Sequence, residues 1–289
     1  MNKNAKPWLI YALITTLFWG VWGAIIEIPE KSGFPPTLGY IVWALTMIPC
    51  AIIALKIIDW KLQYDVKSII LGSLVGIFGA GGQIVLFMAL KEGPAYIVFP
   101  IISLYPVLTI VLSLAILKEK VKIKQGIGIV LALAAIGFLS YQEPSETSNS
   151  LGYAWLILSI IVFIAWGLQA YIMKFSNETM KAESIFFYMM VSALIFTPVA
   201  YYMTDFSQEI NWGFKGPYLA FIIHILNSIG ALTLVYALRY GKAIIVVPMT
   251  GLSPLITIVL SLILYSVLPG TIMTIGLVIA VAAIFLLSD

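Results

Sequence analysis

The sequence predicts an all-α integral membrane protein whose ten transmembrane helices form two inverted five-helix repeats. Three observations support this fold class: the composition, the spacing of the apolar stretches and an internal repeat. Of the 289 residues, 62% are apolar and only 10% are charged, whereas soluble domains carry about a quarter charged residues. We therefore expect lipid to be the solvent for most of the chain, and the bilayer to be its main partner.

Ten apolar stretches are long enough to cross a bilayer, which takes about 20 residues of helix. Short connections that carry charges and turn-forming residues separate them. The first stretch resembles a secretory signal, but more spans follow it, so we expect it to persist as a helix. The predicted spans are residues 8–28, 36–57, 67–90, 95–117, 122–141, 151–173, 183–204, 216–238, 243–265 and 270–288.

The distribution of positive charge predicts the orientation, because Lys and Arg favour the cytoplasmic side. With a cytoplasmic N-terminus, 13 of the 16 basic residues lie inside and only Lys31, Lys91 and Lys215 lie outside. The sequence thus predicts a multi-pass protein of the cytoplasmic membrane with both termini in the cytoplasm.

The chain also contains an internal repeat. Residues 89–140 align without gaps with residues 237–288, at an offset of 148, with 24 identities in 52 positions. Because five spans is an odd number, the second copy must enter the membrane from the opposite side, as in many carriers that work by alternating access. The alternative is an old duplication kept only for packing. The expected units are a first repeat at 1–141, a linker at 142–150 and a second repeat at 151–289.

The order of the motifs resembles the EamA-type transporters of the drug/metabolite transporter superfamily, over essentially the whole chain. The matching motifs are Phe18-Trp19-Gly20, Ala165-Trp166-Gly167, Pro100 with Pro106, and Leu117-Lys118-Glu119-Lys120 running into Gln125-Gly126-Ile127-Gly128. The resemblance implies a ten-helix transporter of small metabolites with a central cavity. The second copy departs from the pattern, because Val267 stands at the position equivalent to Glu119.

We therefore expect a secondary active transporter that moves a small metabolite by alternating access, with proton coupling as one form of energy supply. A sugar or nucleoside-type uptake permease is an alternative, and an intramembrane lipid-modifying protein is an alternative of a different class. The chain has no P-loop for ATP and no hydrolase motif, so we do not expect an enzyme. One His and one Cys make no usual zinc site. We expect no cofactor and no nucleic-acid partner, and a homodimer is one expected assembly.

Polar, aromatic and proline residues within the spans are the candidates for a substrate cavity. Each proline frees a carbonyl four residues back, which a membrane tolerates beside protein or a wet cavity; simple kinking for packing is the alternative. Tryptophans within spans can stack on a flat substrate or only pack. The cavity candidates are Trp19, Gln83, Pro100, Ser103, Tyr105, Trp166, Gln169, His224, Asn227, Pro248, Thr250 and Ser253.

Three ionisable residues are candidates for coupling or gating. His224 lies within a predicted span and titrates near neutral pH; the alternative is a neutral, hydrogen-bonded histidine. Glu27 and Lys174 each lie seven residues after the Gly of a Trp-Gly motif. Because the repeats are inverted, we expect these two residues at opposite ends of the bundle, where each can control access to the cavity. The alternative is that their long side chains only reach the membrane surface.

Overall fold

The structure, a computed structural model, describes residues 6–93, 95–141, 153–265 and 270–288. Within these ranges the chain is helical and contains no β-strand. Eight helices are long and apolar enough to cross a membrane, and two shorter apolar helices cover residues 101–115 and 123–139. These ten segments confirm the predicted fold class. The predicted linker at 142–150 lies outside the described residues.

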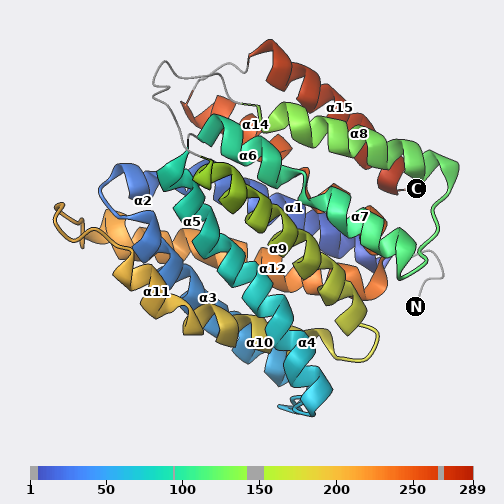
Figure 1. Ribbon diagram of the computed structural model, residues 1–289, viewed down its shortest axis with the longest axis horizontal. Helices are drawn as coiled ribbons and strands as arrows, with labels where there is room; N and C mark the ends of the chain where they lie inside the picture. Colours follow the sequence, from blue (N-terminus) through green and yellow to red (C-terminus); the bar gives the residue numbers. More distant parts are fainter. Residues whose placement is uncertain (1–5, 94, 142–152, 266–269, 289) are drawn as a thin grey trace.

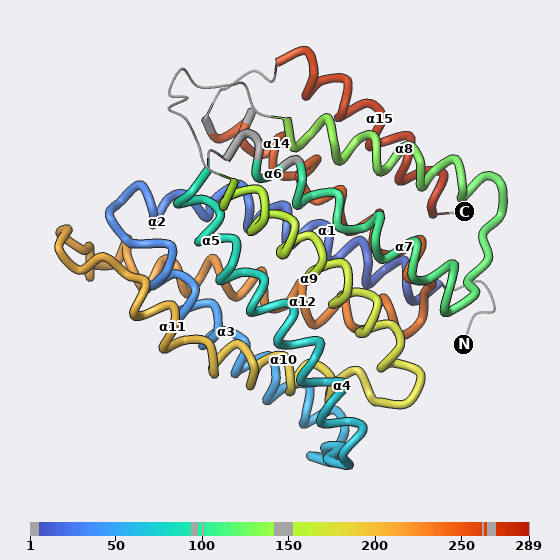
Figure 2. Tube along the Cα trace, in the orientation of Figure 1, coloured from blue at the N-terminus to red at the C-terminus, as the bar shows by residue number. Residues whose placement is uncertain are grey.

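The first five predicted spans correspond to eight α-helices and one π-helical turn, η1, which follow one another along the chain (Figures 1 and 2). Spans one, three and four are each divided into two helices. Their bounds are α1 Pro7–Ile25, α2 Glu27–Lys31, α3 Pro36–Ile57, α4 Val66–Gly76, η1 Ile77–Gly81, α5 Gly82–Glu92, α6 Ala95–Ser103, α7 Tyr105–Ala115 and α8 Ile123–Leu139.

The second five spans contain seven α-helices and one more π-helical turn, η2, and here spans seven and nine are each divided into two helices. Their bounds are α9 Ala154–Ser176, α10 Ala182–Ile195, α11 Thr197–Tyr202, η2 Phe214–Tyr218, α12 Leu219–Tyr240, α13 Ala243–Thr250, α14 Ser253–Tyr265 and α15 Thr271–Ser288.

Prolines explain why spans four and nine are divided. Pro106 and Pro254 are the second residues of α7 and α14, a position at which the missing N–H of proline has no helical partner to lose. Each therefore begins a new helix. Pro248 lies inside α13, which continues through it. Only one of the two proline positions in the repeat thus divides its span.

The two copies run in opposite directions. In Figure 1, α1 starts at the end of the bundle where both termini lie, whereas α9 starts at the other end. At the end where both termini lie, the Lys6 ammonium donates a hydrogen bond of 2.8 Å to the carbonyl of Ser288. We call this end the terminal end and the opposite one the far end. The terminal end also holds the connections at 58–65, 116–122, 177–181 and 241–242.

Helix packing follows the same twofold relation. Helix α1 packs on α12 and α14, and its counterpart α9 packs on α5 and α7. The last helices of the two copies, α8 and α15, pack on each other. Small residues allow this close approach: a Cβ at Gly128 would lie 3.0 Å from the Cβ of Leu286. The centre of the bundle is consequently built from both copies.

Candidate functional site

A cavity of about 370 Å³ lies where the two copies meet. Helices from both repeats supply its walls, and the divided spans four and nine reach it at their breaks. Nine of the twelve predicted cavity residues line it: Trp19, Gln83, Ser103, Tyr105, Trp166, Gln169, Asn227, Thr250 and Ser253. Their binding roles stay predictions.

Trp19, in α1 of the first copy, is held in place by contacts with α12 of the second copy. Its indole Nε1 donates to the backbone carbonyl of Asn227 at 3.2 Å. The ring lies against Gly230, where a Cβ would come within 2.5 Å of it. The Asn227 side chain in turn accepts a hydrogen bond of 2.9 Å from the indole of Trp43. One residue of α12 therefore orients two tryptophans of the cavity wall.

Trp166, in α9 of the second copy, makes the equivalent contacts with the first copy. Its Nε1 donates to the carbonyl of Gly79 at 3.3 Å, and a Cβ at Gly82 would lie 2.6 Å from that nitrogen. Gly79 and Gly82 precede Asn227 and Gly230 by the repeat offset of 148. Gly79 lies in the π-helical turn η1, and single π-helical turns within α-helices occur frequently at functional sites.

The glycines that follow these tryptophans hold the divided spans against the cavity. Thr109 donates to the carbonyl of Gly167 at 2.9 Å, and Thr257 donates to the carbonyl of Gly20 at the same distance. A Cβ at Gly20 would lie 2.3 Å from the Cβ of Ile256. The Trp-Gly motif is thus a docking element used twice, with its tryptophan at the cavity and its glycine against the neighbouring helix.

Several lining residues were not selected from the sequence. They are mostly small or apolar residues, and the sequence alone does not show whether such side chains point into a cavity or toward a neighbouring helix. They are Trp22, Gly23, Trp43, Met47, Gly76, Gly79, Ala80, Ala170, Met173, Met189, Ala231, Leu234, Gly251, Pro254 and Thr257. Trp22 and Trp43 lie within predicted spans, and this position was the signal that could have selected them as lining residues.

The cavity wall carries no formal charge. Among the described residues that line it there is no Lys, Arg, His, Asp or Glu. Four tryptophans and Tyr105 present aromatic rings, and Gln83, Gln169 and Asn227 supply amides. Such a wall offers ring faces with negative electrostatic potential together with hydrogen-bonding groups.

His224 does not line the cavity, contrary to its selection as a lining residue. It is 6% exposed in α12, and its Nδ1 accepts a hydrogen bond of 3.2 Å from Trp22. Its Nε2 has no hydrogen-bond partner among the described residues and faces Gly39, where a Cβ would lie 3.4 Å away. His224 therefore reaches the cavity only through the Trp22 ring.

Of the two predicted proline positions in α6 and α13, the one in α13 lies apart from the cavity wall. Pro248 is buried within α13 and is absent from the lining residues. The side chain of Pro100 lies outside what the structure describes.

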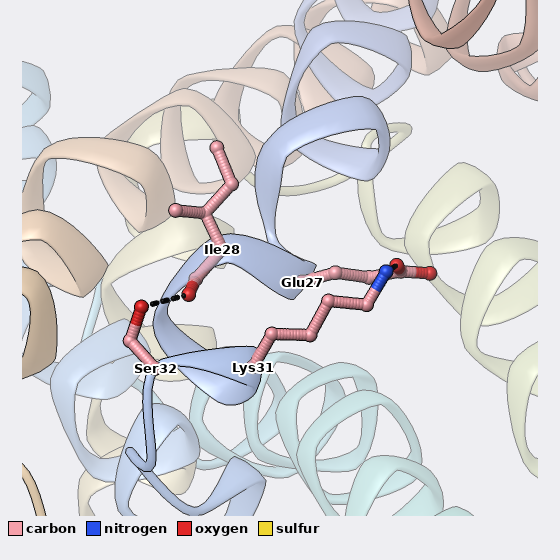
Figure 3. A network of polar contacts seen from close by, with 4 residues as sticks. All are labelled: Glu27, Ile28, Lys31 and Ser32. Atoms are coloured by element: carbon pink, nitrogen blue, oxygen red, sulfur yellow. Dashed lines mark hydrogen bonds and ion pairs between the residues drawn. The ribbon is translucent and has the colours of Figure 1, made fainter. Parts of the chain in front are cut away.

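Glu27 lies on the surface near the far end, away from the cavity wall. It begins the short helix α2 and forms an ion pair of 2.5 Å with Lys31, one turn later, with both side chains more than half exposed. Figure 3 shows these two side chains meeting, beside the hydrogen bond of 2.8 Å from Ser32 to the carbonyl of Ile28. Exposed pairs of this kind contribute little to stability.

Lys174 joins helix α9 to the connection between α12 and α13 at the terminal end. Its ammonium donates to the carbonyls of Leu238 at 3.0 Å and Gly241 at 2.8 Å. A cation at this place complements the negative pole of a helix C-terminus. Lys174 also stays out of the cavity wall.

Glu119 binds the other side of the same connection. Its two carboxylate oxygens accept the backbone N–H groups of Ala243 and Ile244, each at 3.0 Å, and so cap the first turn of α13. The preceding residue, Lys118, has φ +52°, an uncommon backbone conformation outside glycine. It turns the chain so that Glu119 returns to the bundle. Sequence reasoning noted Glu119 as a motif residue without selecting it as a site residue.

Helix α13 lies between the cavity and the terminal end, and all eight of its residues are buried. It packs on α7, α8 and α9, as well as on α1, α12 and α15. The equivalent helix α6 packs on α5, α7, α8 and α9, and over the described ranges it makes at most marginal contact with α1, α14 and α15. The ninth span is therefore packed more closely by both copies, at the terminal end, than the fourth span is at the far end.

Comparison with known proteins identifies the family. The sequence profile of the EamA-like transporter family matches residues 6–141 and again residues 153–289. The chain belongs to the EamA-like transporter family. It is a multi-pass membrane protein of a transporter family, as the sequence motifs predicted.

Individual relatives of this EamA-like chain are more distant. Protein LicB of Haemophilus influenzae is 24% identical over 183 residues, which cover 62% of this chain and 61% of LicB. An uncharacterized transporter of Archaeoglobus fulgidus is 26% identical over 62% of this chain and 63% of its own length. An uncharacterized protein of Methanocaldococcus jannaschii is 36% identical over 46% of this chain and 95% of its own length. The matches thus span only about three fifths of two of these relatives.

A solved crystal structure, described only as that of a protein, has the same fold as this EamA-like chain. It superposes with a TM-score of 0.76 at 14% identity, covering 96% of this chain and 98% of the other. At that identity the likeness concerns the fold alone.

Proposed function

We propose that this EamA-like protein is a secondary active transporter that moves a small organic cation across the cytoplasmic membrane by alternating access. The observation that carries the proposal is the uncharged, aromatic cavity at the junction of two inverted repeats. Substrate sites of inverted-repeat carriers commonly lie at such a junction, near the middle of the bilayer.

The difference between the two ends of the bundle supports alternating access. Glu119 and Lys174 bind the connection before α13 and thereby hold the terminal end closed. Their repeat-equivalent positions carry Val267 and Glu27, so the far end depends on different contacts. Exchanging the conformations of the two copies would open the terminal end and close the far end, as a rocking mechanism requires.

The composition of the cavity wall favours a weakly hydrated organic cation. Ring faces of Trp and Tyr attract a cation, most strongly when its charge is spread over alkyl groups and it loses little hydration. An anion would meet the negative ring faces without a Lys or Arg to compensate. A compact ammonium would lose its water without gaining a carboxylate.

A neutral sugar or nucleoside is the second candidate. Gln83, Gln169 and Asn227 line the cavity together with the tryptophans. Such a combination can hydrogen-bond hydroxyl groups while rings stack on the apolar face of a substrate.

For orientation we propose that the terminal end faces the cytoplasm, because the positive charges concentrate there. Proton coupling is proposed to involve His224, whose hydrogen bond from Trp22 connects it to the cavity wall. Replacing His224 by Gln should then abolish accumulation driven by a pH gradient and spare counterflow exchange. Undiminished proton-driven accumulation in this variant would contradict the coupling role.

The test of the transport proposal is uptake into proteoliposomes that contain the purified chain. Uptake of a panel of labelled solutes would be measured with and without a pH gradient. Unlabelled tetramethylammonium, a sugar, a nucleoside or a dicarboxylate would be added as the competitor. We expect saturable uptake and counterflow that only the organic cation inhibits. Inhibition by the sugar or nucleoside instead would favour the second candidate, and non-saturable flux would indicate a channel.

A further inference from the structure

A second pocket, of about 460 Å³, lies at the terminal end and is separate from the central cavity. Four lysines surround it: Lys6 before α1, Lys120 and Lys122 before α8, and Lys242 before α13. They come from three segments that are far apart in the sequence. We infer that this pocket binds a phosphate group, carried either by an anionic lipid or by a soluble phosphate.

Lys120, Lys122 and Lys242 form no ion pair with a described carboxylate. No Asp or Glu is among its lining residues. Glu119, next to Lys120 in the chain, directs both of its carboxylate oxygens to the backbone of α13. The Lys242 ammonium instead donates to the carbonyl of Lys120, a neutral acceptor. These three lysine charges lie at one site without a described carboxylate partner, which favours an anionic ligand.

The fold adds a further positive pole to this pocket. Helix α8 begins at Ile123, directly after Lys122, and Gln125 in its first turn also lines the pocket. The N-terminus of a helix of 17 residues carries partial positive charge and backbone N–H groups that bind phosphates.

Two aromatic residues place the pocket at the level of lipid headgroups. Trp8, in the first turn of α1, and Tyr240, the last residue of α12, both line it. Trp and Tyr concentrate at the membrane–water interface, where basic pockets between helices bind anionic headgroups.

A phosphate in this pocket would join the segments that close the terminal end. Lys120 follows Glu119, and Lys242 follows Gly241, whose carbonyl accepts the Lys174 ammonium. The ligand would therefore stabilise the closed terminal end while lying outside the substrate cavity.

The test measures ligand-induced stabilisation of the full chain, purified in a neutral detergent. The probes are dioctanoyl phosphatidylglycerol, inorganic phosphate and dioctanoylglycerol, which has the same chains but no phosphate. The pocket variant is Lys122→Gln with Lys242→Gln. Its matched control is Lys56→Gln with Lys67→Gln, two exposed lysines at the same end but outside the pocket.

We expect phosphatidylglycerol to raise the melting temperature of the wild type and of the control, with dioctanoylglycerol having no such effect. The pocket variant lacks two lysines and should need about thirtyfold more lipid for half of the shift, since each basic residue near a membrane surface contributes about 1 kcal/mol. A variant with Arg at both positions should bind as the wild type does, which separates loss of charge from misfolding.

The two sources of phosphate are distinguished by the second probe. If inorganic phosphate reproduces the shift, the ligand is a soluble phosphate; if only phosphatidylglycerol does, it is a lipid headgroup. Equal binding of both phosphate probes by the pocket variant and the control would overturn the proposal, as would a wild type that responds to neither.

Discussion

The hydroxyl of Thr257 donates a hydrogen bond of 2.9 Å to the backbone carbonyl of Gly20, and so joins α14 of the second copy to α1 of the first. Thr109 and Gly167 make the equivalent bond in the other direction. Both carbonyls belong to the residue that follows a cavity tryptophan. The position of each cavity tryptophan is thus coupled to the divided helix of the opposite copy.

Replacing Thr257 with Val should weaken this joint without changing its volume. The lost hydrogen bond is expected to lower the free energy of unfolding by about 1 kcal/mol. Thermal denaturation in detergent measures the change. Thr274→Val in α15 is the control, because this exposed threonine donates to the carbonyl of Gly270, directly before its own helix; an equal effect there would show that the joint contributes nothing of its own.

A methyl group at Gly20 should be poorly tolerated. The Cβ of an alanine would lie 2.3 Å from the Cβ of Ile256, so the helices must separate, at a cost of about 1–3 kcal/mol. Gly137→Ala in α8 is the control, because nothing lies within 4 Å of its added Cβ. We expect a lower melting temperature and slower uptake for Gly20→Ala only. Comparable stability of the two variants would contradict the close packing.

Glu119→Gln should loosen the terminal end. The neutral amide caps the first turn of α13 less well than the carboxylate, by about 1 kcal/mol. Probe cysteines on α13, in a chain whose native Cys50 is replaced, should label faster in this variant. Glu178→Gln, at an exposed acidic residue of the same end, is the control and should label as the wild type does. Unchanged labelling in Glu119→Gln would show that Glu119 does not help to hold the terminal end closed.

Trp166→Leu should weaken substrate binding. If the ring contributes a cation–π interaction of about 1–2 kcal/mol, the half-saturation concentration for uptake should rise about tenfold. Trp60→Leu, at an exposed tryptophan outside the cavity, is the control. Radiolabelled uptake measures both, and identical half-saturation in the two variants would argue against an aromatic substrate site.

Asp65 should make part of the stability depend on pH. It caps α4 by accepting hydrogen bonds from the backbone N–H of Ser68 at 3.1 Å and its hydroxyl at 2.6 Å, which keeps the pKa of this carboxyl below its ordinary value. Because the folded pKa is the lower one, the stabilisation is complete above the unfolded pKa, about 4, and is lost as pH falls through the folded value.

The comparison of Asp65→Asn with the wild type tests this dependence. The variant should melt at a lower temperature at neutral pH, and the difference should shrink in acid. Asp59→Asn, at an exposed aspartate of the same connection, is the control and should lower the melting temperature less at neutral pH. A difference that stays constant from neutral to acidic pH would contradict the prediction.

The sequence alone was sufficient for the ten spans, the inverted repeats and the family. These properties depend on composition, on the length of apolar stretches and on the offset between matching residues, all of which are local or additive along the chain. It also selected most of the polar residues of the cavity wall, because polar groups within a span rarely face lipid.

Only the tertiary structure decided which face of each helix meets the cavity. His224 is buried in its span yet packs against Trp22 and Gly39, and Lys174 binds the end of α12 instead of the cavity. Glu119 reaches α13 across the bundle. The rotation of each helix is set by how glycines such as Gly20 and Gly230 fit against side chains of the opposite copy. Those fits join residues far apart in the sequence, and no local pattern encodes them.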